Sequence, residues 1–393
     1  MYFPIPLVDT LKNLKFVDFS IVQEDMAKLC VLETIKLNHP GGAAGYIVEK
    51  NDRKVCCFLD HEYGQLEKVD KQLSMKPVCD YLSKKLDKKI RLIQENIFDF
   101  DPKTIFVNQE TKIAILENIR FYEEEEKNDE KFAKILSNFG DIFVNDAFSC
   151  SHRNHASVTK ITNFLPSYCG LQMDKEISAL KKITSDIERP ITCIIGGSKI
   201  STKINIIKNL IPRFENIVIV GGMANNILEY KGYKIGKSIK ESNCKKTIEE
   251  IFSLAKIKNC NIFYPTDVSV GKNLNDKSQI KSLSEIENDD LILDIGDETI
   301  KTIVHLIKKS KTILWNGPAG YFENSNFAKG SIQIAQTIVN TENKIYSVVG
   351  GGDTIAVLNK ANTLKQFNFV STAGGAFLEY LEGKEIPGIR ALN

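Results

Sequence analysis

The sequence lacks the features that mark membrane, secreted and nucleic-acid-binding proteins. No apolar run is long enough to span a bilayer, and residues 1–10 contain no basic segment of the kind that opens a signal peptide. The net charge of +2 gives no strong field to attract nucleic acid or an anionic membrane. We therefore expect a cytoplasmic protein that binds neither nucleic acid nor membrane.

The sequence also lacks a disulfide framework, a zinc motif and a Walker A loop. Its nine cysteines are irregularly spaced and no CxxC pair occurs, which favours reduced thiols. The GxxxxGK[ST] pattern of the Walker A loop is absent. With 42% apolar and 26% charged residues, the composition is that of an ordinary globular protein, and 393 residues favour two domains.

Short apolar segments alternate with segments of helical spacing, which predicts an α/β fold with parallel, Rossmann-like sheets. The predicted strands are 15–20, 54–59, 113–116, 142–145, 191–195, 217–220, 261–264, 312–315 and 346–349. The predicted helices include 78–86, 131–137 and 168–188, the last ending before Pro190. We predict a first domain at 1–168, a connecting helix at 169–189 and a second domain at 190–375.

One stretch of the second half has the pattern of an anion site. A buried strand at 191–195 leads into Gly196-Gly197, and a helical pattern follows from Ile204. Such a turn presents backbone N–H groups to an anion. Lys199 and Lys203, four residues apart, are expected on one helical face, where both could reach one phosphate chain. The alternative is an ordinary strand–helix turn with two solvated lysines.

Several other predicted strands of the second half also end in glycine. These turns contain Gly221-Gly222, Gly317, Gly350–Gly352 and Gly374-Gly375. Ligands of open α/β sheets bind at the carboxyl ends of the strands, so the repetition indicates a binding site there. Asp353 fits a magnesium ligand equally as well as a helix N-cap. The acidic run at 123–126, in contrast, is expected to be a solvated face.

Motifs along most of the chain resemble those of phosphoglycerate kinase. The matching segments are LENIRF at 116–121, VNDAF at 144–148, SHRNHAS at 151–157, GGSKISTK at 196–203, VGGMA at 220–224, YKGYKIGKS at 230–238, WNGPAGYFE at 315–323, GGGDT at 350–354 and STAGGAFLEYLEGK at 371–384. Their occurrence in the family's order is specific for fold and ancestry.

The resemblance implies two α/β domains that face each other across a cleft. The first would hold 3-phosphoglycerate or 1,3-bisphosphoglycerate, and the second ADP or ATP with Mg²⁺. The tail, 376–393, would return to the first domain, and the protein would be a monomer. The implied reaction is direct phosphoryl transfer in glycolysis without a covalent enzyme intermediate, which requires alignment and charge neutralisation.

The nucleotide half of the family's site is nearly intact. Lys199 matches the lysine that follows the transferred phosphoryl group, Asp353 the magnesium ligand and Glu323 the residue on the ribose. The implied nucleotide-binding residues are Gly197, Lys199, Lys203, Gly221, Gly222, Asn316, Glu323, Gly351, Gly352, Asp353 and Thr354. Lys199, Gly374 and Gly375 match the groups that act on the transferred phosphoryl.

The phosphoglycerate half departs from the family pattern. Phe16 stands in place of an arginine, and Lys36 is the best match to another. The implied substrate-binding residues are Asp18, Ser20, His61, Arg120, His152 and Arg153. Three alternatives remain open: basic residues moved elsewhere in the cleft, a non-catalytic nucleotide-binding homologue, or a kinase acting on another small acid.

Overall fold

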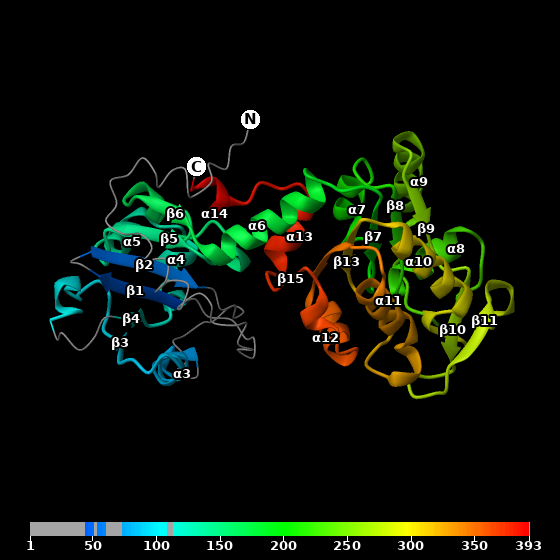
Figure 1. The fold of residues 1–393 in the computed structure, drawn as a ribbon, viewed down its shortest axis with the longest axis horizontal. Coiled ribbons are helices and arrows are strands. Elements are labelled where there is room, and N and C mark those ends of the chain that lie inside the picture. Colours follow the sequence, from blue (N-terminus) through cyan, green and yellow to red (C-terminus); the bar gives the residue numbers. More distant parts are fainter. Residues whose placement is uncertain (1–43, 51–52, 60–72, 108–112, 393) are drawn as a thin grey trace. The chain divides into compact units, whose positions relative to one another are not determined.

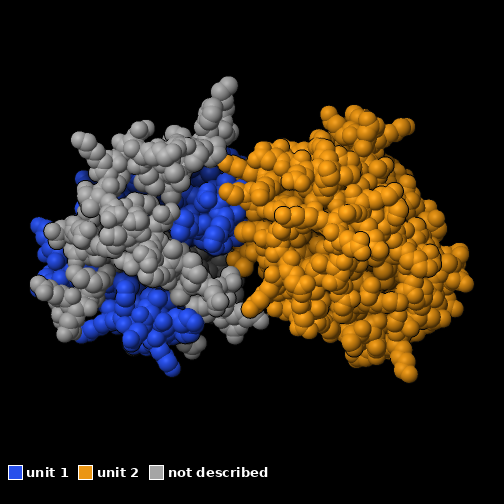
Figure 2. All heavy atoms as spheres, in the orientation of Figure 1, with its two compact units in different colours: residues 1–177, 385–393 blue, residues 178–384 orange. Residues whose placement is uncertain are grey.

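The computed structural model describes residues 44–50, 53–59, 73–107 and 113–392, and the chain divides into two compact units. Unit 1 comprises residues 1–177 and 385–393, and unit 2 comprises residues 178–384; Figure 2 draws them in different colours. The predicted strand at 15–20 lies outside the described residues. Among the helices that the structure describes, none has the length and apolar composition needed to cross a membrane.

The sheet of unit 1 is mixed rather than parallel. Its strand order is β3 (Ile90–Ile93), β4 (Ile113–Leu116), β1 (Ala44–Lys50), β2 (Arg53–Leu59), β5 (Ile142–Asn145) and β6 (Ser167–Cys169). Strand β1, which the sequence did not predict, is antiparallel to β2 and β4, whereas the other pairs are parallel. Only residues 51 and 52 separate β1 from β2, and such a short connection requires the chain to turn back.

Besides the connecting helix, the structure describes four α-helices in unit 1, of which α5 packs into a core rich in phenylalanine. They are α3 (Lys76–Leu86), α4 (Glu123–Glu126), α5 (Glu130–Ser137) and α14 (Pro387–Arg390), with 3₁₀ turns at Pro102–Thr104, Ile119–Phe121, Phe148–Cys150 and Lys160–Asn163. Asp129 caps α5 by accepting a hydrogen bond from the Phe132 N–H at 2.8 Å. That cap begins the helix where Phe132 and Leu136 face the core, and both are fully buried.

The connecting helix is shorter than the sequence predicted. Helix α6 spans Leu171–Thr184, whereas Tyr168 belongs to strand β6. The start of α6 is fixed by Asp146, whose Oδ1 accepts hydrogen bonds from the backbone N–H groups of Gln172 and Met173, at 2.7 and 2.9 Å. The boundary between the compact units falls within this helix, after Ile177.

The main sheet of unit 2 is parallel throughout, as predicted. Its strand order is β15 (Phe369–Ser371), β14 (Tyr346–Gly350), β13 (Thr312–Asn316), β7 (Ile191–Ile195), β8 (Asn216–Ile219) and β9 (Asn261–Phe263). A separate antiparallel sheet of β11 (Gln279–Ser282), β10 (Asp267–Gly271) and β12 (Leu291–Ile295) was not predicted.

Helices cover the main sheet of unit 2 (Figure 1). They are α7 (Ile204–Leu210), α8 (Gly222–Tyr230), α9 (Lys245–Lys258), α10 (Asp297–Lys309), α11 (Lys329–Asn340), α12 (Gly352–Lys360) and α13 (Gly375–Leu381), with 3₁₀ turns at Leu283–Glu285, Ser325–Phe327 and Leu364–Gln366. One core cluster joins β7, β13 and β14 to α10, α11 and α12, and Trp315 is fully buried within it. This packing holds the carboxyl ends of the strands rigidly in one row.

Candidate functional site

The glycine turns of unit 2 meet at one edge of the parallel sheet because the strands end in register. Asn316 at the end of β13 pairs with Ile195 of β7 on one side and Gly350 of β14 on the other. The turns that follow touch each other: a Cβ on Gly317 would lie 2.2 Å from the Gly196 carbonyl oxygen. Glycine is therefore required at Gly317, which also has a φ of +101°.

Lys203 is hydrogen-bonded to the backbone at this edge of the sheet, and it does not share a helical face with Lys199. Helix α7 begins only at Ile204, so the expected one-turn spacing of the two lysines is wrong. The Lys203 ammonium donates hydrogen bonds to the Gly196 carbonyl and to Asn316, whose Oδ1 lies 2.6 Å away. Burial lowers the pKa of Lys203 to about 8, against the opposing charge of Asp353.

Asn316 and Thr354 link the neighbouring turns. The Asn316 amide donates to the Gly350 carbonyl at 2.8 Å, while its oxygen accepts from Lys203. The Thr354 hydroxyl accepts from the Gly317 N–H at 2.7 Å and lies 3.0 Å from the Gly350 oxygen, its acceptor. Both side chains are buried, so they fix the positions of the turns rather than reach solvent.

Asp353 is exposed in the first turn of α12, and the N-cap alternative is wrong. Gly351 occupies the N-cap position, and no side chain caps this helix end. The Asp353 carboxylate instead lines a cavity of about 300 Å³. A lone exposed carboxylate beside a helix N-terminus is compatible with a magnesium ion that takes its other ligands from phosphate oxygens.

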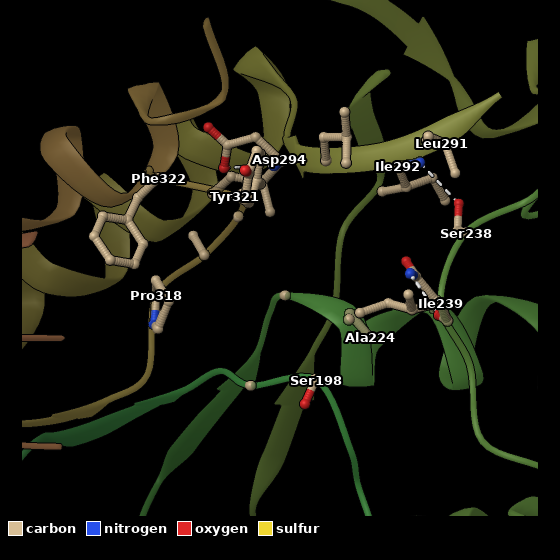
Figure 3. A pocket seen from close by; sticks show the side chains of 18 of the residues that line it. Ser198, Ala224, Ser238, Ile239, Leu291, Ile292, Asp294, Pro318, Tyr321 and Phe322 are labelled. Atoms are coloured by element: carbon tan, nitrogen blue, oxygen red, sulfur yellow. Dashed lines mark hydrogen bonds between the residues drawn. The ribbon is translucent and has the colours of Figure 1, made fainter. Parts of the chain in front are cut away.

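Five of the predicted nucleotide residues line this cavity: Gly197, Gly221, Gly222, Glu323 and Asp353. The remaining ones lie outside its lining; Lys199 is exposed, and Gly374 stands at the N-cap of α13 with a φ of +52°. Figure 3 shows Ser198 and Pro318 across the cavity from Ser238 and Ile292. The wall formed by Ser238, Ile239 and β12 was missed, because an apolar strand gives no local signal of a site.

In unit 1, Arg120, His152 and Arg153 come together around His155, which sequence reasoning did not select. Arg120 follows the cap made by Asn118, whose Oδ1 accepts from its N–H at 3.1 Å. Burial, followed by the charges of Arg120, Arg153 and His152, lowers the pKa of His155 to about 3. The buried Nδ1 of His152 has no hydrogen-bond partner among the described residues.

Glu125 belongs to this cluster, so the predicted solvated face at 123–126 is wrong at that position. Its side chain is fully buried and accepts hydrogen bonds from the Ser157 hydroxyl at 2.6 Å and the Ser157 N–H at 2.9 Å. Its Oε1 lies 3.8 Å from His155 Nδ1. Burial raises the pKa of this carboxyl despite those hydrogen bonds. Glu125 thereby ties α4 to the loop that carries His152 and Arg153.

The remaining residues predicted for the phosphoglycerate half, Asp18, Ser20 and His61, lie outside the described residues. Of the predicted tail, only residues 385–393 belong to unit 1, where the Gly388 N–H donates to the Ser151 carbonyl at 2.7 Å, directly before His152. A Cβ on Gly388 would approach the Ser151 side chain to 2.8 Å, so this contact requires glycine.

Comparisons with known proteins agree on one family. A family model described as phosphoglycerate kinase matches residues 20–384. The chain is 42% identical over 334 residues to the phosphoglycerate kinase of Wolbachia sp. subsp. Drosophila simulans (strain wRi), covering 84% of each chain. It is 41% identical over 329 residues to that of Methylorubrum extorquens (strain PA1), covering 83% and 82% of the two chains.

Solved structures give the same result. The phosphoglycerate kinase from Coxiella burnetii matches with a TM-score of 0.77 and 37% identity, covering 84% of each chain. The phosphoglycerate kinase from Pyrococcus horikoshii OT3 matches with a TM-score of 0.69 and 28% identity, also over 84% of each chain. These structures support the predicted α/β fold class.

Proposed function

Because the chain belongs to the phosphoglycerate kinase family, we propose that the residues described above transfer a phosphoryl group between ATP and the carboxyl group of 3-phosphoglycerate. The family's reaction is reversible and links 1,3-bisphosphoglycerate and ADP to 3-phosphoglycerate and ATP in glycolysis. The proposal is supported by the glycine turns, which follow strands that end in register at one edge of the sheet. Asp353 lines the cavity at this edge, and Lys203 is hydrogen-bonded to the turn at Gly196.

In the nucleotide half, backbone groups supply most of the recognition. The turns at Gly197 and Gly351 would present N–H groups, and α12 begins at the second of these turns. The Gly221 N–H instead donates to the Ala319 carbonyl at 3.1 Å, so Gly221 would contribute close backbone approach rather than a donor. Lys203 adds a positive charge, and Glu323, exposed at the cavity, would accept hydrogen bonds from a ribose. Asn316 and Thr354 hold these turns in place through their hydrogen bonds, and Gly222 and Gly352 would allow the nucleotide to approach the backbone closely.

Mg²⁺ fits the donor set offered here. Asp353 is exposed at the cavity, and none of the described hydrogen bonds or ion pairs uses its carboxylate. When bound with the nucleotide, the ion would neutralise charge on the phosphates. The part played by the chain itself is to hold one hard oxygen ligand beside the N-terminus of α12.

The cluster of unit 1 is the proposed anchor for 3-phosphoglycerate. Arg120 and Arg153 offer guanidinium groups that suit phosphate and carboxylate, and the unpartnered Nδ1 of His152 suits a hydrogen bond from or to the substrate. Asp18, Ser20 and His61 stay proposed members of this half. The carboxyl acceptor follows from the family's substrate and defines the enzyme as a phosphotransferase of that class.

For the transfer step, Lys199, Gly374 and Gly375 are proposed to act on the moving phosphoryl group. Lys199 is exposed, and none of the described hydrogen bonds uses its ammonium, so it can follow that group. Gly374 and Gly375 begin α13 and offer N–H groups at its N-terminus. No protein nucleophile is needed, since alignment and charge neutralisation suffice.

We also propose that the enzyme acts as a cytoplasmic monomer. The described cysteines are all free thiols, in keeping with a reducing compartment. Within the described residues, nothing favours the non-catalytic alternative over the kinase.

The decisive test is a coupled assay with ATP and 3-phosphoglycerate, with the same assay lacking the protein as the control. We expect turnover that depends on both substrates and on Mg²⁺. Turnover no higher than that of the control, at any attainable 3-phosphoglycerate concentration, would refute the proposal. A panel of other small carboxylic acids would then identify the acceptor.

A further inference from the structure

The segment that carries Lys199 has little regular structure of its own. Strand β7 ends at Ile195 and α7 begins at Ile204, so Lys199 lies in the irregular stretch between them. Within that stretch, Ile200 is fully buried, and the Lys203 N–H donates to the Ile200 carbonyl at 3.1 Å. Irregular backbone holds one conformation only when other groups satisfy its donors and acceptors. The position of Lys199 therefore depends in part on contacts from outside the stretch.

Glu241 makes such a contact. Its Oε2 accepts a hydrogen bond from the Ser201 N–H at 2.9 Å, and its Oε1 accepts one from the Ser201 hydroxyl. The Glu241 N–H in turn donates to Oδ1 of Asn226, which is buried in α8, at 2.9 Å. One carboxylate thereby joins the irregular stretch to a packed helix of the same unit.

The Glu241 carboxylate lies near Lys199 without occupying its ammonium. Burial raises the pKa of Glu241, but the hydrogen bonds from Ser201 and the charge of Lys199 hold it below its ordinary value, so the group is ionised at neutral pH. None of the ion pairs in the described part of the chain joins Glu241 to Lys199, and the lysine is exposed. The contacts thus hold the backbone and leave the ammonium available.

Given the proposed role of Lys199 in phosphoryl transfer, on which this inference rests, we propose that Glu241 is a positioning residue for that lysine. Its two contacts with Ser201 fix the backbone two residues after Lys199 and limit the positions that the ammonium can reach. Transfer without a protein nucleophile depends on alignment, and a small displacement of an aligned group can cost about 100-fold in rate. Glu241 does not line the cavity, so it acts through Lys199 rather than on the nucleotide.

Two variants of Glu241 separate its contacts from its charge. Glu241→Ala removes both contacts with Ser201. Glu241→Gln can keep them, because its amide oxygen accepts from the Ser201 N–H and its amide nitrogen donates to the Ser201 hydroxyl. In the coupled assay, Glu241→Ala should lower kcat about tenfold and change the KM for either substrate by no more than about twofold. Glu241→Gln should stay within about threefold of the wild-type kcat.

Glu229→Ala is the matched control. Glu229 forms an ion pair with Lys240, the neighbour of Glu241, and it does not line the cavity. The variant therefore removes a carboxylate next to the same segment and leaves the contacts with Ser201 in place. Its kcat should equal that of wild type, and a wild-type kcat in Glu241→Ala as well would overturn the inference.

A double-mutant cycle tests whether Glu241 acts through Lys199. In the Lys199→Ala background, Glu241→Ala should lower kcat by no more than about twofold, since the group that it positions is absent. A further tenfold loss in that background would overturn the inference, because Glu241 would then affect the reaction by another route.

Trypsin provides a readout that is independent of activity. It cleaves after lysine, and only where the backbone can leave its folded conformation. Cleavage after Lys199 in the substrate-free full chain, followed by mass spectrometry, should be at least about threefold faster in Glu241→Ala than in wild type. Glu241→Gln and Glu229→Ala should be cleaved at the wild-type rate. Equal cleavage of Glu241→Ala and wild type would overturn the inference.

If Glu241→Ala does not fold, Ser201→Ala gives the same test, because it removes the hydroxyl and keeps the backbone contact. A kcat about two- to threefold below wild type would then support the inference, and an unchanged kcat would overturn it. If Lys199→Ala retains the wild-type kcat, the proposed role of Lys199 fails and this inference fails with it. Unchanged trypsin cleavage in Glu241→Ala instead counts against the Glu241 contacts alone.

Discussion

The two candidate half-sites are built from different chemical groups. In unit 2, the groups that face a ligand are mostly backbone groups of glycine turns, aligned by the register of β7, β13 and β14. In unit 1, they are side chains on short turns: Arg120 on a 3₁₀ turn and His152 and Arg153 on the loop after another. Backbone donors persist under most substitutions, whereas each side-chain contact can be lost singly.

This difference accounts for the uneven match to the family pattern. Some glycines of these turns cannot change without steric conflict, as the 2.2 Å approach at Gly317 shows, whereas a Cβ on Gly352 would meet nothing within 4 Å. A cluster of charged side chains tolerates the loss of one member when the others still bind the same ligand. Departures such as Phe16 and Lys36 can therefore accumulate in the phosphoglycerate half. The comparison predicts that single substitutions have more selective effects in unit 1 than in unit 2.

The two regions also differ in the protonation state of a basic side chain whose pKa is lowered by burial. Lys203 is half-buried and bonded to backbone and amide oxygens, and burial lowers its pKa to about 8. His155 lies near basic side chains, and burial together with the charges of Arg120, Arg153 and His152 lowers its pKa to about 3. Lys203 therefore remains charged at neutral pH, whereas His155 is uncharged.

The largest effect is expected for Lys199→Ala. Removing a charge that stabilises the transferred phosphoryl should lower kcat by roughly 100- to 1,000-fold, with a smaller change in KM for either substrate. Steady-state kinetics in the coupled assay measure this. Lys208→Ala is the matched control, since Lys208 lies in α7 and pairs with Glu250 outside the cavity lining. A Lys199 variant with near-normal kcat would remove that residue from the transfer step.

The next prediction sets the two units against each other. Arg153→Ala should raise the KM for 3-phosphoglycerate by about 10- to 100-fold and leave the KM for Mg-ATP nearly fixed, because one charge-assisted contact is lost. Asp353→Ala should give the reverse pattern, through weaker use of the magnesium nucleotide. Both are read from initial rates with one substrate varied at a time.

Arg91→Ala is the control for the arginine, because the Arg91 guanidinium donates to the carbonyls of Thr104 and Ile105 in another part of unit 1. If Arg153→Ala leaves the dependence on 3-phosphoglycerate unchanged, the phosphoglycerate half is built from other residues. If it changes both KM values equally, the two units do not divide the substrates as proposed.

The sequence predicted the unit 2 fold well because strand, glycine turn and helix are local patterns. The strands at 191–195 and 312–316, for example, begin where apolar runs begin and end at glycine. It could not predict what depends on contacts between distant segments. The antiparallel pairing of β1 with β4 is one such case, because Val48 pairs with Ile113, 65 residues later in the chain. The antiparallel sheet around β10 likewise depends on pairing between distant segments, such as that of Ser269 with Asp294.

The same distinction applies to the sites. Asp353 and the glycine turns could be found from local motifs, whereas the burial of Glu125 depends on Ser157, 32 residues away. An acidic run in a sequence predicts a solvent-exposed face, and only the position of the covering loop shows that one of its residues is buried.

A smaller effect is expected from the titration of Lys203. Its lowered pKa means that the free protein loses this charge as the pH rises through about 8, so affinity for Mg-ADP should fall by up to about tenfold per pH unit above that value. Calorimetry from pH 6.5 to 9.5 measures this and should also detect proton uptake on binding. Lys203→Arg stays charged over this range and should remove the decline. An unchanged decline in that variant would assign the titration to another group.

The smallest expected effect concerns stability and comes from His155 in unit 1. The folded-state pKa of about 3 lies below the ordinary value of 6.5, so between these values the unfolded chain binds a proton that the folded protein does not. The free energy of unfolding should therefore fall as the pH drops below 6.5. From pH 7 to pH 5, His155 contributes at most about 2 kcal/mol of this loss. His155→Gln should remove that share, while the nearby Glu125 is present in both proteins. Urea unfolding at the two pH values measures the difference, and equal losses in both proteins would mean that burial and the charges of its neighbours do not hold His155 neutral.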